Sequence, residues 1–351
     1  MSERGPAAKI FSFAGSYAEI DEHYQERGWT DGLPIVPPTE TRVHELLKQT
    51  ARDPREVVGV LPPRQGEATI EKIAANAVMA GCRPEYFPVV LAAIEALVDP
   101  LFNLDSVQAT THPVATLVIV NGPIVRALGI QAGYNSYGQG FRANVTIGRA
   151  VRLTLMNIGG GLPGSGDRAT QGTPAKIAYC VAENEAESPW EPLHVEHGLP
   201  RDASTVTVFG AEGPHNIQDH YSNTARGVLL TVAGAMAQAG SNNLLGRGWP
   251  LLSLGPEHAA TIAKEGYGKQ QVKEFLFEHA RFPFARLGRE YQRQQIERWK
   301  VVESPDTMVP IVERPEDITI IVTGGAGKHS SWQPTFGNGT HWTRRAIAWP
   351  G

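Results

Sequence analysis

Residues 114–123 read VATLVIVNGP, a run of apolar and β-branched residues that ends at an Asn-Gly-Pro turn. Three later segments follow the same pattern, in which an apolar run stops at a glycine: residues 204–214 (STVTVFGAEGP), 249–256 (WPLLSLGP) and 318–327 (ITIIVTGGAG). Short apolar runs bounded by turn residues are typical of buried β-strands. We therefore expect four strands, at 114–120, 204–209, 249–254 and 318–322.

Helical patterns surround these strands. The strongest lies at 68–98, where Gly81 is expected to end one helix in the left-handed conformation and Pro84 to begin the next. This predicts an αα-hairpin with Cys82 at its elbow. Further helices are expected in these regions: residues 17–28, a helix capped by Thr39, 147–158, 222–239, 257–281 with a break near Gly266, and 286–300.

Strands that alternate with helices predict an α/β protein with largely parallel sheets and flanking helices. The 351 residues are enough for two domains of about 150 residues each. We expect an N-terminal α/β lobe that contains the helical hairpin (1–165), a loop-rich linker (166–203) and a C-terminal α/β lobe (204–351).

The composition excludes several classes of protein. The net charge is −4 and Lys and Arg form no block, which argues against a nucleic-acid partner. No apolar stretch reaches the roughly 18 residues that cross a bilayer, and the N-terminus has no signal-peptide pattern. Two cysteines cannot form a disulfide framework. A cytoplasmic protein without a membrane partner is expected.

Histidines follow three of the four predicted strands. In a parallel α/β sheet, ligands bind outside the carboxyl ends of the strands. Two such histidines within hydrogen-bond reach could supply a general base near neutral pH. The alternative is that each one caps a turn or is exposed. The candidates for acid/base catalysis are His215, His258, His329 and, as a second acid, Glu212.

Two glycine-rich segments could bind anions. Residues 324–331 (GGAGKHSS) follow a strand but lack the Ser or Thr that a P-loop needs after its Lys. Residues 138–149 (GQGFRANVTIGR) place Arg142, Asn144 and Arg149 in or beside a loop that opens a helix, although a surface Arg paired with Asp or Glu is an equal alternative. A third segment, residues 159–164 (GGGLPG), matches G-x-G-x-x-G but follows a helical pattern and is interpreted as a helix C-cap and loop. No ATP or NAD site is supported. Candidates for substrate binding come from these segments, from the strand ends and from the elbow of the helical hairpin. They are Arg83, His112, Asn121, Arg142, Asn144, Asn216, Lys328 and Ser330.

Cys82 and two histidines suggest other chemistry. A thiol before a helix and beside Arg83 gains thiolate character, so Cys82 is a candidate nucleophile; otherwise it fills the elbow as a small residue. His194 and His197, with the spacing i, i+3, could bind a divalent transition metal together with a distant third ligand. A solvated Pro-rich loop would explain the same two histidines.

Several segments together resemble a known family. They are DGLPIVPPT (31–39), NAVMAGCRPEYFPVVLAA (76–93), TTHPVATLVIVNGP (110–123), RANVTIGRA (142–150), SPWEPLHVE (188–196), FGAEGPHNI (209–217) and GGAGKHSSWQPTFG (324–337). The resemblance covers about residues 28–345. It is to a bacterial, often actinobacterial, family associated with proteins that carry a UGSC motif, in which U is selenocysteine or its place is taken by cysteine.

The resemblance implies thiol or selenol chemistry on a small molecule, with a second subunit as a possible partner. This chain contains no Cys-Gly-Ser-Cys sequence, so such a motif would have to come from a partner chain.

Three functions follow from these observations. The first is an enzyme of lyase or hydrolase type that acts on a small anionic organic substrate by acid/base or thiol chemistry. The second is a subunit of a redox enzyme whose thiol or selenol lies on a partner chain. The third is a small-molecule binding protein without turnover. A homo-oligomer is expected in each case.

Overall fold

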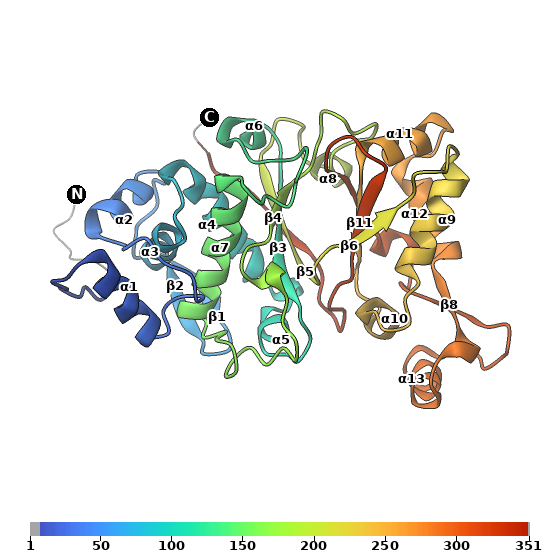
Figure 1. Cartoon of the computed structure of the whole chain (residues 1–351), viewed down its shortest axis with the longest axis horizontal. Coiled ribbons are helices and arrows are strands. Elements are labelled where there is room, and N and C mark those ends of the chain that lie inside the picture. The colour runs from blue at the N-terminus through green and yellow to red at the C-terminus, as the bar shows by residue number, and fades with distance from the viewer. Residues whose placement is uncertain (1–7, 350–351) are drawn as a thin grey trace.

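The four apolar runs form strands in the computed structural model, which describes residues 8–349 (Figure 1). This confirms the strand predictions to within two residues at each end. The strands are β3 (Ala115–Asn121), β5 (Thr205–Ala211), β7 (Leu251–Leu254) and β10 (Thr319–Val322).

These strands belong to two four-stranded sheets. The first has the order β12-β5-β3-β4 and the second β10-β7-β11-β6. The remaining strands are β4 (Cys180–Ala182), β6 (His215–Gln218), β11 (His329–Gln333) and β12 (Thr343–Ala346).

Both sheets are mixed, so the prediction of largely parallel sheets is wrong. Only β3 with β4 and β7 with β10 run parallel. Strand β5 runs antiparallel to both of its neighbours, and so does β11. An apolar run shows that a strand is buried but not which way its neighbour runs. The predicted strands β3 and β5 themselves run antiparallel, and the unpredicted strands β11 and β12 add further antiparallel pairs.

The sheets pack face to face, because residues along β3 alternate between two cores. Val118 and Val120 face a core shared with helices, whereas Leu117 and Ile119 contact a core that includes Leu251 of the second sheet. The outer face of the second sheet packs on its own helices. The result is a four-layer α/β/β/α sandwich, with helices on the left and right of the sheets in Figure 1.

The helices lie where the sequence pattern predicted them. On the side of the first sheet these are α4 (Phe87–Leu97) and α7 (Arg142–Asn157), which contact its strands, and α2 (Glu40–Leu47) and α3 (Ile70–Ala80), which pack farther out. On the second they are α9 (Ala225–Met236), α11 (Pro256–Lys264) and α12 (Lys269–His279). The αα-hairpin is confirmed: Gly81 ends α3 with φ +87°, and Cys82 lies at the elbow before α4.

Shorter elements complete the chain. The helices are α1 (Tyr17–Glu26), α5 (Leu104–Gln108), α6 (Ile124–Leu128), α8 (Leu193–Glu196), α10 (Asn242–Gly246) and α13 (Arg289–Trp299). The 3-10 turns are Pro84–Tyr86, Pro100–Phe102, Pro174–Lys176, Phe284–Arg286 and Pro315–Asp317. The two-stranded sheets pair β1 (Val57–Leu61) with β2 (Gly66–Thr69), and β8 (Arg281–Pro283) with β9 (Met308–Pro310).

The predicted boundary at residue 204 does not coincide with the boundary between the sheets. Strands β5 and β12 follow it in sequence, yet both belong to the sheet that contains β3. The predicted linker, 166–203, contributes β4 to that same sheet. The chain therefore passes between the two sheets more than once.

No helix among residues 8–349 is long and apolar enough to cross a membrane.

Gly148 in α7 provides a test of this packing. A Cβ at Gly148 would lie 2.4 Å from the backbone nitrogen of Tyr179, which leads into β4. Gly148→Ala is expected to lower the free energy of unfolding by about 3 kcal/mol, because backbone cannot yield as a flexible side chain does. Urea unfolding measures this loss.

The matched control is Gly234→Ala in α9, where an added Cβ meets nothing within 4 Å. There the substitution should stabilise by about 0.5–1 kcal/mol, as alanine does in exposed helix interiors. Equal effects at both positions would contradict the close approach of α7 to β4.

Candidate functional site

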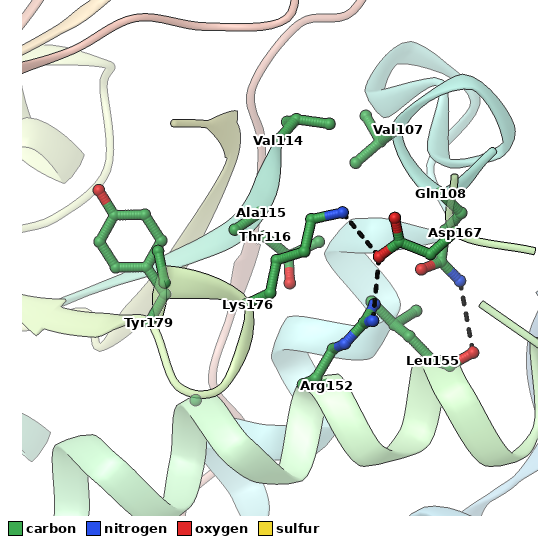
Figure 2. Close-up of a pocket in the computed structure, with 12 residues that line it drawn as sticks. Val107, Gln108, Val114, Ala115, Thr116, Arg152, Leu155, Asp167, Lys176 and Tyr179 are labelled. Atoms are coloured by element: carbon green, nitrogen blue, oxygen red, sulfur yellow. Dashed lines mark hydrogen bonds and ion pairs between the residues drawn. The ribbon is translucent and has the colours of Figure 1, made fainter. Parts of the chain in front are cut away.

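A small cavity lies between α7 and the start of β3 (Figure 2). Its volume of about 10 Å³ is close to what one water molecule requires. The lining side chains come from α5, α7, β3 and the segment 167–179: Val107, Gln108, Val114, Ala115, Thr116, Arg152, Leu155, Asp167, Ala175, Lys176 and Tyr179.

Asp167 is the centre of the polar contacts in this cavity. One carboxylate oxygen, Oδ2, accepts hydrogen bonds from Lys176 Nζ at 2.6 Å and from Arg152 Nη2 at 3.1 Å. The other, Oδ1, accepts from the backbone N–H of Ala169. Figure 2 shows both cations pointing toward Asp167. All three charged side chains are nearly buried, with 6–12% of their surface exposed.

Burial dominates the electrostatics of the two cations. It lowers the pKa of the Lys176 ammonium, because the charged form loses its hydration. Asp167 opposes this effect, and the neighbouring Arg152 adds to it by repulsion. Burial also lowers the pKa of the Arg152 guanidinium. When both cations are charged, the single carboxylate leaves this group with a net charge of about +1.

This arrangement suits the binding of an anion and the transfer of a proton. Arg152 offers a planar guanidinium that can pair with a carboxylate. Lys176, with its lowered pKa, is suited to general acid/base work. Tyr179 does not compete for these roles, because its hydroxyl donates a hydrogen bond to the carbonyl of Glu212.

Sequence reasoning missed this cavity because it treated residues 166–203 as a linker. One signal was available. Arg152 lies in the helical pattern that carries Ile147, Val151 and Leu155 toward the core. A buried arginine beside such residues needs a carboxylate partner, although spacing alone does not identify Asp167.

Several of the residues that were predicted to lie at strand ends do lie together, at a different place from this cavity. Nε2 of His329 lies 3.1 Å from Nε2 of His220, and Nδ1 of His329 lies 3.0 Å from Oδ1 of Asn216. The Lys328 ammonium donates to the carbonyls of His220 and Ser222 and to Oδ1 of Asn223. These groups are mostly exposed, and their hydrogen bonds join the start of β11 to the end of β6.

His258 and Ser330 lie beneath this surface and are both buried. Nε2 of His258 is 3.1 Å from the carbonyl oxygen of Asp219, which can only accept, so this nitrogen carries the proton. Nδ1 then accepts from the Ser330 hydroxyl at 2.8 Å. Ser330 Oγ in turn accepts from the N–H of Gly255, the residue that precedes α11. This chain of bonds fixes α11 to the sheet.

The remaining acid/base candidates lie farther along the strands. His215 pairs with Trp332, three residues beyond His329 on β11, and its Nε2 lies 3.2 Å from Nε2 of Gln238. Glu212 follows the far end of β5 and binds His112 at 2.8 Å. The structure therefore places His258, His329, Ser330, Lys328 and Asn216 together, and His112 with Glu212 elsewhere.

Cys82 does not have the expected thiolate character. It is buried, and its Sγ donates to the carbonyl of Thr146. Burial raises the pKa of the Cys82 thiol to about 12, so the predicted lowering is wrong. Arg83 is exposed and does not reverse this effect. Cys180 is also buried, and burial raises the pKa of its thiol.

Two of the predicted anion-binding residues bind the protein itself. The side chain of Asn144 is buried and bonds to the backbone of neighbouring segments. Its Oδ1 accepts a hydrogen bond from the N–H of Gln131, and its Nδ2 donates to carbonyl oxygens that include that of Cys180. Arg142 donates two hydrogen bonds to the carbonyl of Gly81, at the end of α3. The neighbouring Arg149 forms a two-hydrogen-bond pair with Asp31 at 2.7 and 2.8 Å.

The predicted metal ligands are not arranged as a metal site. His194 is fully buried, with Nε2 3.3 Å from the carbonyl oxygen of Arg201. His197 packs against the Trp342 ring, and burial lowers the pKa of its imidazole. Between residues 8 and 349, no three or more His, Cys, Asp or Glu side chains are placed to hold one metal ion.

Comparisons of the chain with family models, curated proteins and solved structures found no match.

The buried His258 predicts how stability depends on pH. Burial lowers the pKa of His258. Below about pH 6.5 the imidazole therefore binds a proton in the unfolded chain but stays neutral in the folded protein. The free energy of unfolding should fall as the pH drops from 7.5 to 5.5, by up to about 1.4 kcal/mol per pH unit for this group. Burial raises the pKa of Asp219, but its hydrogen bonds from Ser222, Thr231 and Tyr221 outweigh this effect, and the net pKa of about 2 keeps Asp219 outside this window.

Urea unfolding of His258→Asn at pH 7.5, 6.5 and 5.5 tests this expectation. The slope should be smaller than in the unmodified protein, with His44→Asn on the exposed surface of α2 as the control. His197 contributes a slope of the same sign, so His197→Asn is measured alongside. An unchanged slope in His258→Asn would contradict the role of its burial.

Proposed function

We propose that this protein is an enzyme that acts on a small organic anion by acid/base chemistry, with its site at the cavity around Asp167. The observation that carries the proposal is the pairing of two nearly buried cations, Arg152 and Lys176, with one carboxylate. Perturbed ionisable groups beside a cavity are typical of functional sites. The excess positive charge favours an anionic ligand.

Arg152 and Lys176 would have different roles. The guanidinium of Arg152 would hold the substrate carboxylate, in place of part of its contact with Asp167. Lys176 would transfer a proton at the atom next to that carboxylate, as expected for a reaction of lyase type. Asp167 would orient both cations and keep Lys176 within reach of its proton acceptor.

Entry of the substrate requires movement, because the cavity has room for only one water molecule. The segment that would move is the glycine-rich loop, residues 159–166, which leads into Asp167. Gly160 and Gly164 in this loop have positive φ angles of 76° and 80°, a conformation that glycine adopts without strain. Such a loop can act as a lid that closes over a bound substrate.

Binding is tested first with a panel of small anions. Acetate, glycolate, pyruvate, malonate and inorganic phosphate are each added to the purified protein, and the unfolding temperature is measured. At least one carboxylate should raise it, because ligands that bind only the folded state stabilise that state. Arg152→Met and Lys176→Met should abolish this rise, whereas Lys264→Met, at an exposed lysine of α11, should not.

Proton transfer is tested with the carboxylate that binds. In D2O, NMR should show deuterium entering the position next to the carboxylate at a rate that rises with pH as Lys176 loses its proton. Lys176→Met should reduce this rate by at least about 100-fold, the usual contribution of a general base. Binding without exchange would contradict the enzymatic part of the proposal, and no binding by any anion would contradict the site.

A further inference from the structure

A second group of buried polar residues lies at the opposite end of β3. It combines Asn121 at the end of β3, Glu183 after β4, His194 in α8, and Thr205 and Thr207 in β5, each no more than 1% exposed. We call these five residues the acceptor cluster. Each has one side-chain nitrogen or oxygen with no hydrogen-bond partner among the described residues: Asn121 Oδ1, Glu183 Oε1, His194 Nδ1, Thr205 Oγ1 and Thr207 Oγ1.

Hydrogen bonds and strand pairing hold the cluster together. Asn121 Nδ2 donates to Glu183 Oε2 at 2.6 Å and to Glu185 Oε1 at 3.0 Å. His194 Nδ1 lies 3.9 Å from the same Glu185 oxygen. Asn121 is directly opposite Thr205 across β3 and β5, and Thr207 is one pair farther along that face. Leaving one buried polar atom unpaired costs about 1–3 kcal/mol, so five in one place need an explanation.

Three of the unpaired atoms can only accept. Asn121 Oδ1 is an amide oxygen, and Glu183 Oε1 is a carboxylate oxygen. Nε2 of His194 faces the carbonyl of Arg201 and so carries the ring proton, which leaves Nδ1 of a neutral ring as an acceptor. The two threonine hydroxyls can accept as well. These acceptors therefore need either a cation or hydrogen-bond donors as partners.

A proton on Glu183 does not solve this problem, although burial raises the pKa of its carboxyl. Oε2 already accepts from Asn121 Nδ2 and from the backbone N–H of Leu193. A proton on Oε1 would turn one acceptor into one donor and could pair with only one of the other acceptors, so three of the five polar atoms would stay unpaired.

The charges around the cluster also favour a cation. Three carboxylates, Glu183, Glu185 and Glu196, face two ammonium groups. Lys269 Nζ is 2.9 Å from Glu196 but 3.8 Å from Glu183, and Lys273 binds Glu196 at 2.5 Å. With these groups ionised and His194 neutral, the net charge is about −1.

We propose that the acceptor cluster binds one monovalent cation of the size of potassium or ammonium. Asn121 Oδ1, Glu183 Oε1 and the hydroxyls of Thr205 and Thr207 would supply its oxygen ligands. A single excess negative charge matches a monovalent ion, and amide and hydroxyl oxygens suit hard cations better than transition metals. The cation would tie the end of β3 to β5 and to the segment that carries Glu183.

The test compares chloride salts at equal ionic strength. The unfolding temperature is measured in potassium, ammonium, lithium and choline chloride. Potassium and ammonium should raise it by about 3 °C or more over choline, which is too large to enter. Glu183→Gln should remove this difference, whereas Glu187→Gln, the same change at an exposed glutamate, should keep it.

Thr205→Val gives a second readout with a change of sign. In choline it should be at least as stable as the unmodified protein, because an unpaired hydroxyl is replaced by a methyl group of similar shape. In potassium it should be less stable, because a ligand is lost. The control is Thr154→Val, whose hydroxyl donates to the Ala150 carbonyl; its effect should be the same in both salts.

A direct observation completes the test. With ¹⁵N-labelled ammonium, NMR should show one bound ammonium ion per chain, absent in Glu183→Gln. Equal unfolding temperatures in all four salts, or a salt response that survives both Glu183→Gln and Thr205→Val, would overturn the proposal and leave water as the occupant of the cluster.

Discussion

The packing of the two sheets against each other is the constraint on which the rest of the structure depends. Leu117, Ile119 and Val181 of the first sheet share a core with Leu251 and Ile321 of the second. On β3 this layer is formed by Leu117 and Ile119, in the middle of the strand. The two polar groups described above lie at the two ends of the strand. The cavity around Asp167 lies at its start, and the acceptor cluster lies at its end.

Both of these places hold charges at a cost in stability. Removing a cation such as Arg152 or Lys176 from water costs several kcal/mol, and one carboxylate repays only part of this. Apolar residues of similar size would pack there more stably. This cost is one reason why we propose a ligand for the two buried cations around Asp167. The same reasoning applies to Glu183, which has a buried oxygen without a donor.

The sequence was most informative where local rules decide the structure. Thr39 caps α2, Gly81 ends α3, and α11 and α12 separate around Gly266, as the pattern predicted. Strand direction was not predictable. An apolar run such as β3 or β5 does not show which way its neighbour runs. The edge strand β6 was itself missed, because only Ile217 is buried in it and a short polar strand leaves little apolar signal.

The candidate site was only partly accessible to sequence reasoning. The rule that ligands bind at strand ends correctly grouped His258, His329 and Ser330. Their hydrogen bonds, however, fix α11 and β6 to the sheet. The thiolate prediction for Cys82 used the helix end and Arg83 and could not include burial, which is the dominant effect. Asp167, Arg152 and Lys176 meet because a loop folds back onto α7. No spacing rule encodes that contact.

The most direct test of the central claim is the titration of Lys176 itself. Protein labelled with ¹³C at the lysine ε-carbon is titrated by NMR, and the Lys176 signal is assigned by its loss in Lys176→Met. We predict that this lysine titrates below the ordinary value of about 10.4 and that a bound carboxylate raises its pKa. A Lys176 that titrates at the ordinary value, and does not respond to any carboxylate, would contradict the account.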